Sequence, residues 1–485
     1  CRQAAPATPP PRPVMAAEGE ASKHAVAVDD VGGPSAEDVR EASPKLIFLI
    51  CLISAIEGAD MILLPSVFAA LQLDLHLSLS DLAQMSLFQA VFQSAAAPVW
   101  GVLADRGILQ RKTILVVGAV LQGLVTCILA GVDSLAIIVA LRSLNGALLA
   151  TLRPVSSGML ADVTSEARRG KVFGWPSMAV NIGMVFGGLI GTPLSTQSIA
   201  GMQGWRVAFL GFGGASVLIG LAVALLMTEP ERDRSMDSQK RDMCHEARRL
   251  AAFFRLPTFT ALVVQGIFGG VTVSCMGYRT LFFQVSGITD FQASVLQSAG
   301  LLALACGSML GGVLSDCLVK RCLPLHGRPL LAQVSLILAF PNLWLTFIFD
   351  PPEDVVFQFY LGLSILGGLT AWCVVAVNLP ILSEIVPANS RSAIMAWQTA
   401  LEGAASAVLG NSMVGLFAEN VFGYDLSNTD REHIKSEQNR KALGLALLFI
   451  TCVSLSICFC FYSLLHWSYP RDLRLARAAA LALAA

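Results

Sequence analysis

Ionisable residues inside long apolar stretches are the positions at which this sequence could do chemistry. Acidic Glu57, Asp60 and Glu402 and basic Arg142 and Arg153 interrupt runs that otherwise carry almost no charge. A charge at the centre of a lipid bilayer costs roughly 3 kcal/mol or more unless it faces a partner or water. These residues therefore indicate a polar pathway or a proton-exchange site inside a membrane protein.

Glu57 and Asp60 lie three residues apart, so they share one face of a helix. At a rise of about 1.5 Å per residue, Glu57 and Arg142 both lie roughly 12 Å below the outer ends of their spans. We therefore expect these two side chains to meet, directly or through water. The hypothesis is that Glu57 or Asp60 exchanges a proton near Arg142. The alternative is a static buried ion pair that fixes helix register.

The remaining polar positions have two interpretations each. Arg153 lies deeper, where it either faces an anionic substrate or reaches the inner headgroups, and Arg279 is expected to snorkel near the outer end of its span. Glu402 is expected to face protein rather than lipid. Asn181 and Asn378 are included in the predicted pathway, and interhelical hydrogen bonding is their default role.

The composition around these positions is that of a membrane protein. Of the 485 residues 55% are hydrophobic and only 14% are charged, and the mean hydropathy is +0.66. There is no basic stripe for nucleic acid. The 12 cysteines and 6 histidines have no metal-ligand spacing, so we expect no metal, no cofactor and no enzyme activity.

Hydropathy divides the chain into about twelve candidate spans, because a bilayer core takes about 20 apolar residues as helix. All must be helices, since no stretch alternates with the period of two that a membrane barrel needs. Their approximate limits are 46–66, 81–103, 113–132, 134–160, 172–195, 206–228, 257–285, 291–314, 329–349, 355–383, 391–418 and 442–466.

Lysine and arginine fall in alternate loops. Basic residues follow the second, fourth, eighth and tenth spans, whereas loops 67–80, 132–134 and 350–354 contain none. By the positive-inside tendency, the basic loops and both termini face the cytosol. Loop 425–441 mixes basic and acidic residues on the predicted outer side, and we interpret it as a hydrated loop that crosses regardless of charge.

Polar segments divide the chain into five parts. Residues 1–45 are predicted to be a disordered tail, and they begin with Cys1, so either Met15 is the start or the chain is a fragment. Residues 46–228 and 257–466 are predicted to form two six-helix bundles. A cytosolic linker, 229–256, with a surface helix at 244–254 separates them. Residues 467–485 are a tail too short for another crossing.

Two loop motifs occur once in each half. Gly101-Val-Leu-Ala-Asp105-Arg106 after the second span resembles Gly312-Val-Leu-Ser-Asp316 after the eighth. After the fourth span Asp162 precedes Arg169 by seven residues and Trp175 follows six later; after the tenth, Glu384, Arg391 and Trp397 repeat this spacing. Repeats at matching topological positions indicate two related halves, as a rocking transporter requires.

At this point the chain resembles the major facilitator superfamily, whose inner-face signature GxxxDRxxxxR/K is matched by Gly101, Asp105, Arg106, Arg111 and Lys112. The resemblance covers about residues 46–466. It implies a polytopic all-α fold of about 12 transmembrane helices in two pseudo-symmetric halves, in which the first span lines the cavity. Arg142 with Gly146 resembles that superfamily's RxxxG signature, often associated with proton coupling.

Two runs resemble particular groups within the superfamily. Pro98 to Arg106 and Ile56 to Asp60 look like spinster-type lipid transporters, although Met61 occupies the position where that group usually has a basic residue. Gly174, Gly183, Gly187 and Gly191 resemble the glycine spacing of proton-coupled drug antiporters, with Gly188 in place of the expected proline. In membranes such glycines allow close helix packing.

The loop residues are predicted to form a cytosolic gate. Asp105 would accept hydrogen bonds from the amino end of a neighbouring helix and pair with arginines such as Arg169 across the inner face. The alternative is that the basic residues only determine topology. The predicted gate residues are Gly101, Asp105, Arg106, Arg111, Lys112, Asp162, Arg169, Asp316, Glu384 and Arg391.

The sequence thus predicts a monomeric secondary transporter of a small organic or lipid-like solute, working by alternating access in a lipid bilayer. Protons are the candidate coupling ion. An uncoupled facilitator, and a transport-inactive receptor or scaffold with a transporter fold, stay open as alternatives.

Overall fold

The computed structural model describes residues 43–105, 109–164, 169–229, 253–386, 391–425 and 435–484. Eleven helices within these ranges are long and apolar enough to cross a membrane. The predicted tail 1–45, apart from its last three residues, and most of the predicted linker 229–256 lie outside the described residues. So does the greater part of the outer loop 425–441.

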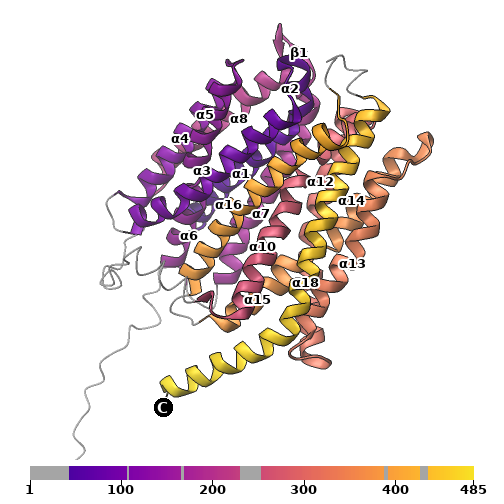
Figure 1. Ribbon diagram of the computed structural model, residues 1–485. Coiled ribbons are helices and arrows are strands. Elements are labelled where there is room, and N and C mark those ends of the chain that lie inside the picture. The colour runs from indigo at the N-terminus through magenta and orange to yellow at the C-terminus, as the bar shows by residue number, and fades with distance from the viewer. Residues whose placement is uncertain are drawn as a thin grey trace, which may run out of the picture. The chain divides into compact units, whose positions relative to one another are not determined.

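The first half consists of helices and one short hairpin (Figure 1). Its elements are α1 (Pro44–Ser66), α2 (Phe68–Leu75), α3 (Leu79–Asp105), α4 (Arg111–Leu129), α5 (Leu135–Leu149), α6 (Leu152–Asp162), α7 (Arg169–Ser195), β1 (Ser198–Ile199), β2 (Met202–Gln203) and α8 (Gly204–Leu226). The strands pair antiparallel through a turn at Ala200 and Gly201, both with positive φ, a turn geometry typical of tight hairpins.

The second half repeats this arrangement with more interruptions. Its elements are α10 (Pro257–Met276), α11 (Arg279–Val285), α12 (Asp290–Arg321), α13 (Gly327–Phe347), the 3₁₀ turn η2 (Glu353–Val355), α14 (Val356–Leu369), the π-helical turn η3 (Cys373–Asn378), α15 (Leu379–Ile385), α16 (Arg391–Leu416), the π-helical turn η4 (Phe417–Val421) and α18 (Glu437–Ala484). Long helices are what a bilayer demands, since each satisfies its own backbone hydrogen bonds.

The outer surface of the bundle is apolar. Leu225 is 84% exposed and Met309 is 77% exposed, and many other large apolar side chains share this surface. The apolar core lies between the helices, where Phe282, Phe347 and Tyr360 pack edge to face. A surface of this kind needs lipid around it, so the chain is a multi-pass membrane protein.

Local signals explain where several helices begin and end. The side chain of Ser43 accepts a hydrogen bond from the backbone N–H of Leu46, and Pro44 occupies the first turn of α1. Thr289 and Gln292 form a capping box at the start of α12. After a single-residue break at Val67, α2 continues the first span to Leu75.

Four helices make most of the contact between the two halves. In the first half α3 and α7 form the contact, and in the second half α16 and α12 do so, with α3 against α16 and α7 against α12. These are the second, fifth, eleventh and eighth spans of the sequence prediction. A twofold pseudo-symmetry that exchanges the halves relates one contact to the other, which confirms the expected fold.

The tenth predicted span, 355–383, is not one continuous helix. The chain leaves helical geometry between α14 and η3, and the π-helical turn then leads into α15. The side chain of Ser335 in α13 binds the freed backbone: Ser335 Oγ donates to the Thr370 carbonyl (2.5 Å) and accepts from the Trp372 N–H (3.3 Å). Broken helices inside membranes need such partners.

The predicted tail, 467–485, begins inside the last helix. Helix α18 contains Pro470 and continues to Ala484, and Figure 1 shows that its carboxyl-terminal part is bent relative to the rest of the helix. Tyr469, Asp472 and Leu473 are buried, and Asp472 Oδ2 accepts a hydrogen bond from the Thr258 N–H at the start of α10 (2.9 Å). Residues 467–473 are therefore part of the second bundle, because Asp472 caps the start of α10. The hydropathy pattern alone did not indicate this contact.

Close packing of α1 against α7 depends on glycine. A Cβ built on Gly183 would lie 1.9 Å from the carbonyl oxygen of Ala55, and one on Gly58 would lie 2.0 Å from that of Val180. No rotamer change relieves a clash with backbone. The predicted packing role of the α7 glycines is thus visible at Gly183, whereas Gly174 in the same helix has open space around it.

Gly183→Ala should lower the thermal stability of the detergent-solubilised protein, because α1 and α7 must separate to admit the methyl group. We expect a loss of about 1–3 kcal/mol, as for other overpacked sites. Gly174→Ala is the matched control and should leave the melting temperature unchanged or raise it, since alanine favours helix. Equal effects of the two substitutions would contradict the packing.

Candidate functional site

A buried carboxylate lies at the centre of the first half. Asp60 is 3% exposed, and donors from three other helices converge on it. Gln122 Nε2 (2.9 Å), Thr126 Oγ1 (3.4 Å) and Asn145 Nδ2 (3.5 Å) reach its Oδ1, and Gln89 Nε2 (3.2 Å) reaches its Oδ2. All four donors are neutral, so the site satisfies a carboxylate with hydrogen bonds rather than with an ion pair.

The donors are themselves held in place. Asn145 Nδ2 also donates to Thr126 Oγ1 (3.1 Å), and Gln89 Nε2 also donates to Asn145 Oδ1 (3.0 Å). Ser216 of α8 donates to Gln122 Oε1 (2.6 Å), which fixes the orientation of that amide. The network thus ties α1, α3, α4, α5 and α8 together, and a change at Asp60 reaches most of the half.

Arg142 is fully buried beside this network. Its Nη2 donates to Oε1 of Gln89, the residue whose Nε2 donates to Asp60. Gln89 therefore bridges the guanidinium and the carboxylate. Two other guanidinium nitrogens, Nε and Nη1, have no hydrogen-bond partner among the described residues. A buried arginine with unused donors is costly.

Glu57 does not meet Arg142. Its Oε1 forms an ion pair with Arg153 Nη2 at 3.0 Å; Glu57 is buried, and the side chain of Arg153 is 60% exposed. The predicted direct pair of Glu57 with Arg142 is therefore wrong. Substrate contact and headgroup contact were the two roles expected for Arg153. Neither of them included this ion pair with Glu57.

The length of the first helix explains the error. Helix α1 is continued by α2 to Leu75, so Glu57 lies roughly 27 Å along the helical path from that end. Arg142 lies only roughly 10 Å from the start of α5 at Leu135. Asp60, one turn nearer the outer end than Glu57, is the acid connected to Arg142.

Gln89→Leu should destabilise the protein, because it removes the hydrogen-bond partner that Arg142 has in the described structure and one donor to Asp60. We expect a loss of about 2 kcal/mol or more, as for a buried charged group left unsatisfied. Thermal unfolding of the purified protein measures it. Gln197→Leu, at an exposed position, is the control, and an equally small effect of both changes would contradict the bridging role.

Asn378 in the second half belongs to a polar chain. Asn378 Nδ2 donates to Gln265 Oε1 (2.7 Å), and its Oδ1 accepts from the Tyr462 hydroxyl (2.8 Å). This chain holds the π-helical turn η3 against α10 and α18. Asn181 instead donates to the Ser177 carbonyl in its own helix (3.0 Å). Arg279 does not snorkel as expected, because its Nη2 donates inward to Ser364 (2.6 Å).

Half of the predicted cytosolic gate residues fall where the structure gives no side chain. Arg106 and the side chains of Asp105, Asp162, Arg169 and Arg391 lie outside the described residues. Of the others, Gly101 is open, since a Cβ built on it would meet no described atom within 4 Å. Lys112 is half-buried and Asp316 is exposed. The predicted Asp105 to Arg169 latch stays a prediction.

Two of the predicted gate residues have partners within their own half or the linker. The Arg111 N–H donates to Glu229 Oε1 (2.9 Å), so Glu229 caps the start of α4. Glu384 binds Arg328 of α13 and accepts a hydrogen bond from Tyr469 of α18. This contact anchors α15 inside the second half.

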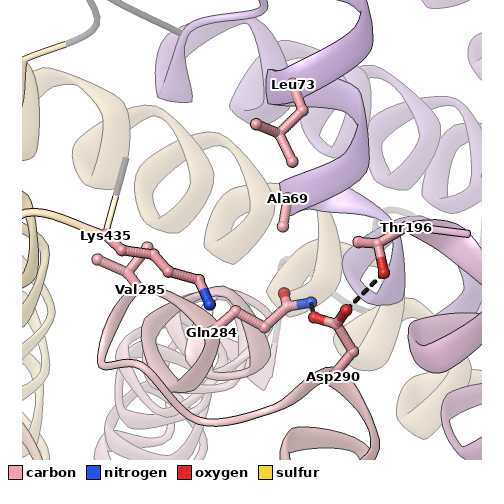
Figure 2. A pocket seen from close by; sticks show the side chains of 7 residues that line it. All are labelled: Ala69, Leu73, Thr196, Gln284, Val285, Asp290 and Lys435. Carbon is pink, nitrogen blue, oxygen red and sulfur yellow. Dashed lines mark hydrogen bonds between the residues drawn. The ribbon is translucent and has the colours of Figure 1, made fainter. Parts of the chain in front are cut away.

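The halves are joined at the predicted outer end, by contacts that sequence reasoning missed. Glu419 in η4 accepts from Ser80 at the start of α3, through the backbone N–H (3.0 Å) and the hydroxyl (2.5 Å). Asp290 at the start of α12 accepts from Thr196 Oγ1 (2.5 Å) just after α7, and from Gln284 Nε2 (2.8 Å). Figure 2 shows this second contact beside a pocket that Ala69 and Lys435 also line.

The two carboxylate contacts are related by the pseudo-symmetry of the halves. Each joins the end of the fifth or eleventh span to the beginning of the eighth or second. Glu419 and Ser80 are 339 residues apart, so only an argument from the repeat could have paired them. We name these two contacts the outer latch. Between residues whose side chains the structure describes, every hydrogen bond that joins the halves lies at this end.

Tyrosines extend the outer latch. The hydroxyl of Tyr424 donates to Gln72 Oε1 (3.4 Å), and Phe68 of α2 packs on Tyr278 with ring centroids 5.1 Å apart. Burial raises the pKa of Tyr424, which therefore keeps its proton and remains a donor. Both contacts cross between the halves.

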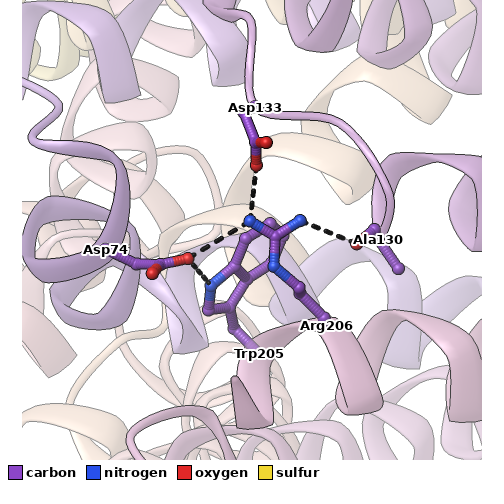
Figure 3. Close-up of polar contacts among 5 residues, drawn as sticks. All are labelled: Asp74, Ala130, Asp133, Trp205 and Arg206. Carbon is purple, nitrogen blue, oxygen red and sulfur yellow. Dashed lines mark hydrogen bonds and ion pairs between the residues drawn. The ribbon is translucent and has the colours of Figure 1, made fainter. Parts of the chain in front are cut away.

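An ionic cluster stabilises the outer end of the first half. Arg206 contacts Asp133 Oδ1 (2.5 Å), Asp74 Oδ2 (3.3 Å) and the Ala130 carbonyl (2.9 Å), and it lies over the Trp205 ring (Figure 3). Trp205 Nε1 donates to the same Asp74 oxygen (2.9 Å). The cluster links α2, α8 and the loop between α4 and α5, so this end of the half can move as one body.

Glu419→Ala should open the outer end. In a cysteine-depleted background carrying Ala69→Cys, we expect labelling by a membrane-impermeant maleimide to accelerate about tenfold, because hydrogen bonds to a charged group contribute about 1.5–3 kcal/mol. Glu353→Ala, at an exposed acid on the same side, is the control. Unchanged labelling after Glu419→Ala would show that these bonds do not hold the end shut.

Comparison with solved structures identifies the class of fold. A bacterial homologue of the human lysosomal transporter Spinster, in an inward-facing and occupied conformation, aligns with a TM-score of 0.73 at 19% identity, covering 89% of this chain and 99% of that one. The nucleoside transporter NupG aligns at 0.65 with 13% identity, covering 86% and 98%. At these identities the likeness establishes the fold alone.

A model of the Major Facilitator Superfamily matches residues 50–411, and the chain belongs to that family. The expected family is thereby confirmed. Quinidine resistance protein 1 of Saccharomyces cerevisiae is 34% identical over 143 residues, 29% of this chain and 24% of that protein. Quinolone resistance protein NorA of Staphylococcus aureus is 26% identical over 167 residues, 34% and 41% respectively. The chain thus matches less than half the length of these relatives.

Proposed function

We propose that this protein is a secondary transporter that moves a small organic solute across a membrane by alternating access and couples the movement to protons. The observation that carries the proposal is Asp60, a buried carboxylate held by neutral donors and connected through Gln89 to a buried arginine, two of whose donors have no partner among the described residues. Such intramembrane acids are typical of proton relays.

Protonation of Asp60 would change the balance between conformations. In the outer-closed arrangement four donors point at this carboxylate. A proton on Asp60 prevents one of its oxygens from accepting a hydrogen bond and adds a further donor. The surrounding side chains already have more donors than acceptors, so this arrangement loses stability. Protonation therefore favours the alternative, outer-open conformation, in which Arg142 finds new partners.

The outer latch supports alternating access. It consists of two related contacts between the halves, at the end where the Arg206 cluster links helices of the first half. A rocking motion that breaks both contacts together opens the predicted outer side. The exposed side chain of Arg153 supports access from the predicted cytosolic side. The predicted gate at Asp105 would close that side in turn.

The proposal also includes the topology, the oligomeric state and the substrate. The basic loops support cytosolic termini. A monomer is the oligomeric state included in this proposal. The names of the yeast and staphylococcal relatives support quinidine-like and quinolone-like organic compounds as first substrates to test. A lipid-like solute is the alternative that the sequence resemblance favours.

Asp60→Asn should abolish gradient-driven transport. In proteoliposomes with an imposed pH gradient, we expect the wild type to accumulate quinidine or norfloxacin and the variant to lose about 90% or more of that rate, because an amide neither binds nor releases the proton. Glu57→Gln should lose less, since Arg153 and not the Asp60 network contacts it. Glu353→Gln is the control.

Accumulation by Asp60→Asn at the wild-type rate would refute the proton site. Two alternatives give different results: an uncoupled facilitator equilibrates the solute without accumulating it, and a transport-inactive receptor binds the solute without moving it. Failure of the wild type to take up any probe under the gradient would contradict the transport proposal itself.

A further inference from the structure

Glu402 is a carboxylate in the middle of the second half for which the proposed proton site has no use. It lies eleven residues after the start of α16, roughly 17 Å along the helix. A Cβ built on Gly266 of α10 would be 2.2 Å from the Glu402 carboxyl carbon, so this carboxylate rests directly on the α10 backbone. The next residue, Gly403, faces Ser94 of α3. Glu402 is therefore next to the contact between halves.

Among the described residues around Glu402, hydrogen-bond acceptors outnumber hydrogen-bond donors. Gln398 Nε2 donates to Glu402 Oε1 (2.7 Å). Gln398 is 7% exposed, and its own Oε1 is buried without a hydrogen-bond partner among the described residues. Within the described part of the chain, no lysine, arginine or histidine lies within ion-pair distance of Glu402, and no donor reaches its Oε2. Two oxygens thus lack a hydrogen bond at one place.

The other two mid-span carboxylates are satisfied by the protein. Glu57 has Arg153 at 3.0 Å, and Asp60 has four donors. Glu402 has one neutral donor, Gln398, and a carboxylate at this depth without a cation or further donors is costly in a membrane. The missing partner is a cation that can donate hydrogen bonds, and the described ranges of the chain do not provide it. A ligand that enters between the halves can supply it.

We infer that Glu402 and Gln398 form the recognition site for the protonated amine of an organic substrate. The ammonium donates to Glu402 Oε2 and to Gln398 Oε1, and the ion pair forms away from bulk water, where charge-assisted hydrogen bonds are strongest. This inference rests on the proposed function, for which it names the substrate class: amphipathic amines rather than neutral or anionic solutes. Gly266 is the position that leaves room for the carboxylate.

Binding of a matched pair of compounds tests the inference. Propranolol carries a protonated secondary amine, and N-acetylpropranolol has the same aromatic skeleton without the charge. Isothermal titration of the full-length protein in detergent near neutral pH should give at least about tenfold tighter binding of propranolol. Glu402→Gln should remove this preference, Gln398→Leu should reduce it, and Gly266→Ala should also reduce it by displacing the carboxylate. Glu353→Gln should retain it.

The outcomes are distinguishable from those of the proton site. Equal binding of the two compounds by the wild type, or an unchanged preference in Glu402→Gln, would overturn the amine site. Gradient-driven transport that is lost in Asp60→Asn would still support the proposed function in that case. Weaker propranolol binding at acidic pH in the wild type, absent in Glu402→Gln, would support competition between amine and proton for the same carboxylate.

Discussion

The hydrogen bonds around Asp60 are the interaction on which the rest of the structure depends. A buried carboxylate needs either a cation or several donors, and here neutral amides and a hydroxyl from α3, α4 and α5 supply them. Because α8 orients one of these amides, five of the six spans of the first half are connected to a single titratable group. A change in the charge of Asp60 would therefore affect hydrogen bonds in most of the first half.

The connection to the other half is made elsewhere. Both carboxylates of the outer latch come from the second half, and both donor hydroxyls come from the first. Inside the first half, the Arg206 cluster and the glycine contacts between α1 and α7 keep the helices together. Among the residues that the structure describes, the hydrogen bonds that join the halves lie at one end, which is compatible with the proposed rocking motion.

The sequence predicted the number and order of the spans well, because apolar length and alternating basic loops depend on physics that each segment carries by itself. The break in the tenth span was missed, since Ser335 of another helix compensates for it. Glu57, Asp60, Arg142 and Glu402 were identified as charges inside the spans. Their partners were not: Arg153 and Gln89 depend on helix length and on the packing of α3, which periodicity does not contain.

The outer latch illustrates the same limit. Nothing marks Ser80 or Glu419 locally, and the repeat suggested their relation only after the helices were placed. The loop motif at Asp105, in contrast, was prominent in the sequence because a membrane protein concentrates its basic residues on one side. Loop motifs that occur in both halves could therefore be identified from the sequence, whereas side-chain pairs between the two halves could not.

The measurement that tests the role of Asp60 most directly is the distance between the outer ends of the two halves as a function of pH. Spin labels at Ser198 and Glu353, both exposed on that side, would report it by pulsed electron resonance in lipid nanodiscs. We expect acidification to increase the long-distance population in the wild type, because protonating a carboxylate disfavours the donor set that holds it. Asp60→Asn should remove this response. A pH response that persists unchanged in Asp60→Asn would contradict a proton switch at this residue.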